Sequence, residues 1–266
     1  MSRNFLLAAF LVIPIVLAGC ADDGVLSPPT DDAAVIGGSS PAETPDLASR
    51  APFGNPQVLP PNSTPYGRTY EEWAIEWWRW LWSAPPAVNP GLDATGENID
   101  FGQEGPVWFL APNYGGVNVR SATIPTGKAL FVDVAAWFDS PGIGGSEDVD
   151  ELFASVNAAA EATSDVRLVV DGVAVPDIEL FRLTAGPFDV TVPEDNMWDL
   201  FGIPTPAGTY GPSATEGWFV MLPPLSAGEH TIEIFADLGP GFGVSDVTVH
   251  LTVEGRLNGK GNPRAN

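Results

Sequence analysis

Residues Tyr70–Ser83 read YEEWAIEWWRWLWS, and no other stretch of the chain is as dense in large apolar side chains. Thr69 and Glu72 have the spacing of a capping box, in which each side chain satisfies a backbone N–H of the other residue. Acidic residues in the first turn favour the helix dipole, and Pro85 ends the helix. The stretch therefore predicts a helix over residues 69–83.

The polar side chains of this helix fall in one narrow stripe at about 100° per residue, and the remaining surface is mostly apolar. Trp77 and Trp78 lie far from the stripe and are predicted to be core residues. Two interpretations stay open for the stripe: it faces solvent above a core helix, or it lines an open groove. Carbohydrate would suit a groove, because indoles stack on sugar C–H faces and carboxylates accept sugar hydroxyls. The predicted ligand groove consists of Glu72, Glu76, Arg79, Trp80 and Trp82.

The N-terminus predicts export. Residues 1–19 have a short basic start and an apolar run that is too short and too interrupted by proline to span a membrane stably. The sequence Leu17-Ala18-Gly19-Cys20 resembles a bacterial lipobox, which implies a lipoprotein signal peptide over residues 1–19 and a lipid anchor on Cys20. Alanine after the cysteine implies anchoring at the outer membrane or cell surface. Because Cys20 is the only cysteine, the mature chain can form no intramolecular disulfide.

Composition divides the rest of the chain into three parts. Residues 20–56 are acidic and rich in proline, with too little apolar surface to offset the entropy of ordering, so they predict a disordered tether. Residues 57–255 are predicted to form a single domain. Residues 256–266 are rich in Gly and Asn and predict a flexible tail.

The charge of the chain restricts its partners. Its net charge is −23, with 34 acidic and 11 basic residues, which argues against nucleic acid and against docking on anionic lipid headgroups. Acidic oxygens cluster in the loop from Asn89 to Gly105, where Asp93, Glu97 and Asp100 are minor calcium candidates. Their spacing lacks the order of an EF-hand loop, so no metal site and no cofactor is predicted.

Short alternating segments separated by Gly and Pro turns indicate a mainly β fold. Val244–Val253 alternates most cleanly, with Val247, Val249, Leu251 and Val253 predicted to face the core. The pattern predicts an antiparallel β-sandwich, immunoglobulin-like or jelly-roll-like, with two helices. The second helix is expected over residues 147–163, capped by Ser146, and the turn at residues 125–128 is expected to join two strands as a hairpin. The other expected strands cover residues 107–110, 117–124, 129–136, 178–183, 188–192, 217–222 and 229–235, and residues 167–175 are expected to form a hairpin that turns at Asp171-Gly172.

The domain contains five short motifs, each at one place in the chain: Trp73-x3-Trp77-Trp78-x-Trp80, Asn89-Pro90-x2-Asp93-x-Thr95-Gly96, Gly105-Pro106-Val107-Trp108-Phe109-Leu110, Pro125-x-Gly127-Lys128-Ala129-Leu130-Phe131, and Leu222-Pro223-Pro224-Leu225-Ser226-x-Gly228-Glu229-His230-Thr231-Ile232. Together they resemble an uncharacterised family of exported bacterial proteins, over residues 66–253. The resemblance implies domain limits but no activity. Its members often carry cysteines near positions 99 and 122, where this chain has Ile99 and Ala122, so apolar contact would replace any disulfide there.

Catalytic chemistry has little support in the sequence. His230 and His250 lack metal-ligand spacing and no Gly-x-Ser-x-Gly elbow is present, although a Ser-His-Asp arrangement of distant residues stays open. No catalytic residue is assigned. We expect a lipid-anchored extracytoplasmic protein, a non-catalytic binding or structural module of the cell envelope with carbohydrate as its candidate ligand. The alternative is a secreted hydrolase acting on polysaccharide or envelope polymer through paired carboxylates, with Glu72 and Glu76 as candidates.

The lipobox generates the first prediction. In a bacterium that processes lipoproteins, the wild-type chain should fractionate with membranes, and Cys20→Ser should move it to the soluble fraction because the acylated side chain is lost. Fractionation followed by immunoblotting measures this. If both proteins remain soluble, the lipid anchor does not exist.

Overall fold

The computed structural model describes residues 57–255; the predicted signal peptide, Cys20, the predicted tether and the predicted tail lie outside this range. The described chain is mainly β, with two sheets of mixed orientation and three α-helices. The helices are α1 (Tyr70–Ser83), α2 (Val149–Ala162) and α3 (Met197–Leu200). The strands are β1 (Val107–Leu110), β2 (Gly116–Ile124), β3 (Ala129–Asp139), β4 (Ser164–Val170), β5 (Val173–Ala174), β6 (Arg182–Val192), β7 (Gly208–Leu222), β8 (Gly228–Asp237) and β9 (Val244–Val253).

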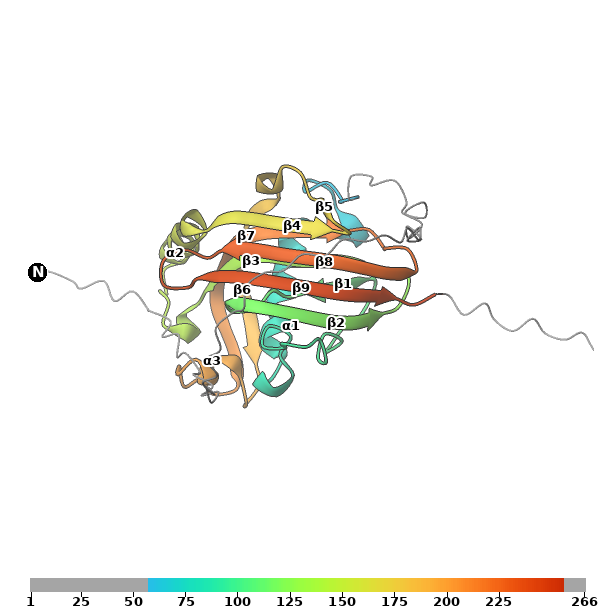
Figure 1. Cartoon of the computed structure of the whole chain (residues 1–266). Coiled ribbons are helices and arrows are strands. Elements are labelled where there is room, and N and C mark those ends of the chain that lie inside the picture. Colours follow the sequence, from blue (N-terminus) through green and yellow to red (C-terminus); the bar gives the residue numbers. More distant parts are fainter. Residues whose placement is uncertain (1–56, 256–266) are drawn as a thin grey trace, which may run out of the picture. The chain divides into compact units, whose positions relative to one another are not determined.

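One sheet has the strand order β1-β3-β7-β6 and the other the order β2-β9-β8-β4-β5. Figure 1 shows the five-stranded sheet in front, with β3, β7 and β6 behind it. The prediction of purely antiparallel sheets is wrong, because β1 pairs with β3 and β2 pairs with β9 in parallel. The physical reason lies in the connections: strands that pair in parallel here are separated by loops or by other strands, so no tight turn sets their direction.

The predicted hairpin at residues 125–128 is also wrong. Its flanking strands belong to different sheets, since β2 pairs with β9 whereas β3 pairs with β1 and β7. Each end of the turn is held by its own sheet: the Ile124 carbonyl accepts the N–H of Glu254, and the N–H of Ala129 donates to the Pro106 carbonyl. Turn chemistry thus predicted correctly that the chain changes direction, but strand partners depend on distant residues.

Helix α1 forms as the sequence predicted. Thr69 Oγ1 accepts the N–H of Glu72 at 3.2 Å, and Glu72 Oε2 accepts the N–H of Thr69 at 2.8 Å, so the capping box is complete. One face of the helix packs on the four-stranded sheet, where the Trp77 indole N–H donates to the Leu110 carbonyl at 3.1 Å. The helix therefore begins, ends and docks through interactions that its own sequence encodes.

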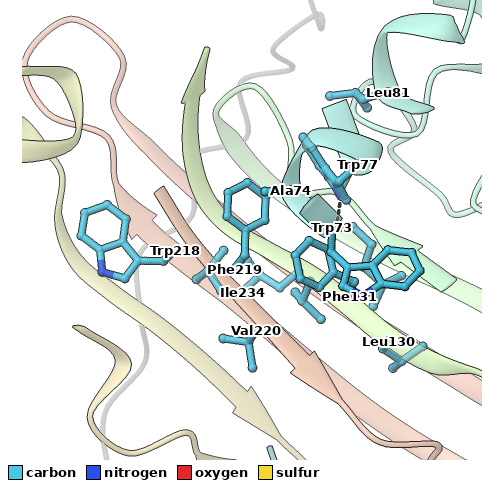
Figure 2. Close-up of a cluster of buried hydrophobic side chains, with 14 of the residues drawn as sticks. Trp73, Ala74, Trp77, Leu81, Leu130, Phe131, Trp218, Phe219, Val220 and Ile234 are labelled. Carbon is cyan, nitrogen blue, oxygen red and sulfur yellow. Dashed lines mark hydrogen bonds between the residues drawn. The ribbon is translucent and has the colours of Figure 1, made fainter. Parts of the chain in front are cut away.

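An aromatic cluster joins α1 to the four-stranded sheet (Figure 2). The Trp77 ring lies 5.9 Å from the Phe219 ring of β7 in an edge-on geometry, and Phe219 stacks on Phe131 of β3 with centroids 5.5 Å apart. Trp77 is 1% exposed, and Trp78 is also buried, as predicted. Because large aromatic side chains bury on the order of 150–250 Å² each, this contact contributes much of the core.

Trp80 and Trp82, which the sequence placed in the predicted ligand groove, are buried. The Trp80 indole N–H donates to the Phe101 carbonyl at 2.8 Å, so the loop before β1 covers it. Trp82 packs edge-on against Trp198 of α3, with ring centroids 5.7 Å apart. Both segments lie outside α1, and helical spacing alone cannot show which flank of a helix another segment will cover.

Helix α2 lies near its predicted position but has a different cap. Asp148, not Ser146, accepts the first free N–H, that of Asp150, while the Ser146 hydroxyl donates to Glu151 at 2.6 Å. The helix packs against β7 and β3. The segment 178–183, predicted as a strand, contains a 3-10 helix at Ile178–Phe181, and α3 was not predicted.

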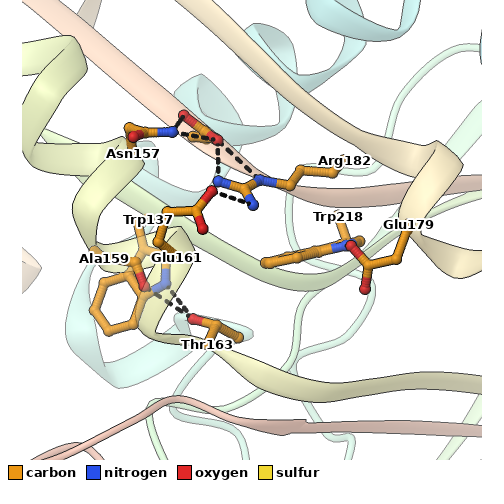
Figure 3. Close-up of polar contacts among 9 residues, drawn as sticks. Trp137, Asn157, Ala159, Glu161, Thr163, Glu179, Arg182 and Trp218 are labelled. Atoms are coloured by element: carbon orange, nitrogen blue, oxygen red, sulfur yellow. Dashed lines mark hydrogen bonds and ion pairs between the residues drawn. The ribbon is translucent and has the colours of Figure 1, made fainter.

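Polar contacts fix α2 to the four-stranded sheet (Figure 3). Arg182 on β6 bonds the buried Glu216 carboxylate of β7 through Nε at 2.9 Å and pairs with Glu161 of α2 at 2.8 Å. Burial alone would lower the pKa of Arg182, but bonds to these two carboxylates raise it above its usual range. Asn157 of α2 donates to the same Glu216 carboxylate at 3.2 Å. The buried carboxylate therefore accepts hydrogen bonds from both α2 and β6.

The position of Trp77 generates the second prediction. Trp77→Ala should lower the free energy of unfolding by about 3–5 kcal/mol, because it removes a buried ring and leaves the Leu110 carbonyl without its donor. Leu180→Ala is the control, since Leu180 is 65% exposed and its truncation should change little. Urea unfolding measures both. Equal stabilities for Trp77→Ala and the wild type would show that α1 does not organise the core.

Candidate functional site

A groove of about 700 Å³ runs beside α1, between its polar stripe and the paired strands β6 and β7. From the helix side come Arg68, which precedes the N-cap, and the residues of the stripe. The sheet forms the opposite wall with residues 187–189 of β6 and residues 211–212 of β7, which belong to no sequence motif. The lining residues are Arg68, Glu72, Ile75, Glu76, Arg79, Pro187, Phe188, Asp189, Gly211 and Pro212.

Two arginines share one carboxylate in this groove. Glu76 Oε1 lies 2.8 Å from Arg79 Nη1 and 3.2 Å from Arg68 Nη1. Arg79 also donates through Nε to the Asp189 carbonyl at 3.0 Å, which fixes the helix to the edge of β6. Both arginine side chains remain almost half exposed, so guanidinium N–H groups stay available to a ligand.

The remaining walls of the groove combine acceptors with apolar surface. Asp189 brings a carboxylate over β7, where a Cβ at position 211 would lie only 1.9 Å from its Oδ1, so Gly211 leaves room for it. Ile75, Pro187 and Pro212 present carbon surface between the charged groups. The groove therefore offers donors, acceptors and apolar patches side by side.

The structure brings together only part of the predicted ligand groove. Glu72, Glu76 and Arg79 line it, whereas Trp80 and Trp82 are buried in the core and cannot stack on a ligand. Sequence reasoning missed Arg68 and the wall from Pro187 to Asp189. Only the polar stripe signalled the groove, because the opposite wall comes from strands more than a hundred residues away.

A second groove, of about 370 Å³, lies where the loop before β1 meets the outer face of the five-stranded sheet. The loop contributes Glu97 and Asp100, and the sheet contributes Glu229 of β8 together with hydroxyl-bearing residues of β2 and β9. Thr252 donates to the Glu229 carboxylate at 3.0 Å. Ile99 and Ala122 also line this groove.

The three calcium candidates do not converge. The Asp93 carboxylate points into its own loop and accepts the N–H groups of Thr95, Gly96 and Asn98 at 2.8–3.0 Å. Burial raises its pKa, but these backbone hydrogen bonds outweigh burial and lower the pKa below its usual value. Glu97 and Asp100 face the second groove instead. Within residues 57–255 no three His, Cys, Asp or Glu side chains form a group that could hold a metal ion.

One Ser-His-Asp arrangement is present, but its geometry is structural. His230 Nδ1 lies 2.7 Å from Asp171 Oδ2, and Nε2 lies 2.9 Å from the backbone carbonyl of Ser226. The Ser226 hydroxyl is farther, at 3.4 Å. Nε2 lies closer to the backbone carbonyl than to the hydroxyl, so the ring is not aligned on the hydroxyl as a catalytic base would be. The contact ties the entry of β8 to the turn between β4 and β5.

Asp133 on β3 is an ionisable side chain in the core. It pairs in register with Phe219 and so lies on the sheet face that α1 covers. It is 2% exposed, and its Oδ1 has no hydrogen-bond partner among the described residues. Burial raises the pKa of this carboxyl well above its usual range. Asp133 lines neither groove.

Comparison of the chain with protein-family models, curated proteins and solved structures found no match. In the part of the chain that the structure describes, no helix is both long and apolar enough to cross a membrane. The two grooves and the residues around them therefore carry the functional argument.

The burial of Asp133 generates the third prediction. A folded-state pKa above the unfolded value of 3.8 means that the native state binds more protons than the unfolded state at intermediate pH, so stability falls as pH rises. Asp133→Asn removes this pH-dependent loss of folding stability, because the asparagine side chain does not ionise. At neutral pH the variant should be more stable than the wild type by at least about 1 kcal/mol, and the gap should narrow towards low pH.

Urea unfolding from about pH 5 to about pH 8 measures the gap. Asp100→Asn is the matched control, because Asp100 is exposed, and it should follow the wild type. A gap that stays constant with pH would show that Asp133 is as ionised in the folded protein as in the unfolded chain, so that burial does not raise its pKa.

Proposed function

We propose that this chain is a non-catalytic binding module that holds a polyhydroxyl ligand, a glycan of the cell envelope, in the groove beside α1. The observation that supports this is the pairing of Arg68 and Arg79 with Glu76 at the surface of an open groove. Guanidinium donors next to carboxylate acceptors match the alternating donors and acceptors of neighbouring sugar hydroxyls.

The charge of the groove favours a neutral or weakly charged ligand. Two arginines face the carboxylates of Glu72, Glu76 and Asp189, so the local charges nearly cancel although the chain as a whole is strongly acidic. Ile75, Pro187 and Pro212 supply apolar surface for the C–H faces of a sugar ring. In this proposal, these residues take the stacking role that the sequence assigned to the indoles.

The hydrolase alternative has weaker support. Glu72 is engaged in the helix cap and Glu76 is paired with two arginines, so both candidate carboxylates already have protein partners. A glycosidase needs one carboxyl that can donate a proton and a second that can act as base or nucleophile. Glu76 is thus part of a paired set of donors and acceptors, which suits ligand binding better than proton donation.

The fold and the location complete the proposal. We infer a β-sandwich, because residues of both sheets, such as Phe219 and Ile234, belong to one hydrophobic cluster. Whether its topology is immunoglobulin-like or jelly-roll-like is secondary to the binding role. We further propose that Cys20 anchors the module by a lipid and that residues 20–56 space it from the membrane, as the lipobox-like sequence implies.

The fourth prediction tests the groove. The purified protein should bind a subset of bacterial polysaccharides on a glycan array, and Arg79→Gln should weaken that binding by about tenfold or more, because it removes charged donors at the groove surface. Isothermal titration against the best polysaccharide gives the affinities, and thermal melts check that the variant is folded.

Arg167→Gln is the matched control. Arg167 is also an exposed, ion-paired arginine, bonded to Asp165 at 3.0 Å, but it lies on β4 outside the groove. It should bind glycan like the wild type. Equal losses in both variants, or glycan cleavage by the wild type, would contradict the proposal.

A further inference from the structure

Each sheet has two edge strands, and three of these four edges are protected against pairing with another chain. β1 has four residues, and the Gln103 side chain bonds both the N–H and the carbonyl of Phe109. β5 has two residues. β6 is bulged near Pro187 and is contacted by Arg79 of α1. Short strands, bulges, prolines and covering groups are the usual means of blocking a sheet edge.

β2 lacks this protection along its first half. In the part of the chain that the structure describes, it pairs only with β9, and its register with β9 is regular over nine residues. The Ser121 N–H donates to the Thr95 carbonyl of the covering loop at 2.8 Å, so Ser121 points away from β9. Since backbone groups alternate along a strand, Val119 and Val117 point their N–H and C=O groups to the same free edge.

Within residues 57–255, the N–H groups of Val117 and Val119 donate no hydrogen bond to a turn, loop or side chain, and their carbonyls accept none. The side chains beside them are apolar and exposed: Val117 is 70% exposed and Val119 is 59% exposed. Arg120, the one charged residue of β2, is buried and donates to the Ala111 carbonyl at 2.7 Å. No exposed charged side chain of β2 therefore disfavours pairing at this edge. Among residues 57–255, the first half of β2 is therefore an unpaired strand edge bordered by apolar side chains.

The exposed charges next to this edge, on β9 and in the second groove, are acidic. Asp246 of β9 lies in register with Val117, and the second groove, with Glu97, Asp100 and Glu229, adjoins β2 at Ser121 and Thr123. A second copy of this chain would bring the same acids and a net charge of −23. Charge complementarity therefore favours a strand with basic flanking residues.

We propose that the Val117–Val119 edge of β2 binds an extended segment of a basic partner protein by strand addition, with a lysine or arginine side chain of that segment in the second groove. Main-chain hydrogen bonds to Val117 and Val119 hold the segment, and the carboxylates of the groove select its charge. This surface is separate from the groove beside α1, and the proposal does not depend on glycan binding.

The test uses the full-length protein and a fluorescent KTVTVTK peptide as the probe, with ETVTVTE as the charge-reversed control peptide. Fluorescence anisotropy should show binding of the basic peptide that weakens with added salt, and no binding of the acidic peptide. Methylation of alternate backbone nitrogens of the basic peptide, on the set that faces β2, should weaken binding by about tenfold. Equal binding of methylated and unmethylated peptides would overturn the proposal.

Val119→Pro is the matching change in the protein. Proline removes the edge-facing N–H and is tolerated on edge strands because that group bonds nothing in the sheet. It should weaken peptide binding by about tenfold, whereas Val119→Thr keeps the N–H and should bind like the wild type. Glu97→Gln should reduce the salt dependence. Dimers in sedimentation velocity that Val119→Pro abolishes would assign the edge to a second copy and overturn the proposed basic partner.

Discussion

The contact between Trp77 and Phe219 is the interaction on which the rest of the domain depends. Phe219 lies on a central strand of the four-stranded sheet and stacks on Phe131 of the neighbouring central strand, so the indole packs on a pair of rings that joins two paired strands. The same indole donates to the Leu110 carbonyl of β1, which extends the contact to a third strand. Because interiors are close-packed, this arrangement leaves α1 a single rotation about its axis.

That rotation places the polar stripe of α1. With Trp73, Trp77 and Trp78 directed into the core, the stripe must face the edge of the sheet beside β6. The groove exists because the stripe is too polar to pack there and the bulged strand β6 cannot close over it. Arg79 then bridges the gap at one point, through its bond to the Asp189 carbonyl, and the rest stays open.

Sequence predicted those parts of the fold that neighbouring residues control. The capping box of α1, the core positions of Trp77 and Trp78 and the alternation of β9 follow from local spacing, and all are confirmed. Strand pairing, the burial of Trp80 and Trp82 and the far wall of the groove depend on residues distant in the chain. The same limit applies to Asp133, since nothing around it in the sequence indicates that it lies beneath a helix.

The parallel pairing of β2 with β9 explains why one edge of the five-stranded sheet stays open. After Ile124 the chain leaves for the other sheet, so no hairpin partner returns along β2. The loop before β1 reaches the edge only at Ser121, where Gly96 is required because a Cβ would lie 2.3 Å from the Ser121 carbonyl oxygen. Its approach covers the second half of β2 and carries Glu97 and Asp100 to the adjoining groove, and no other segment within residues 57–255 pairs with the edge at Val117 and Val119. The same loop that ends the free edge thus supplies the charge beside it.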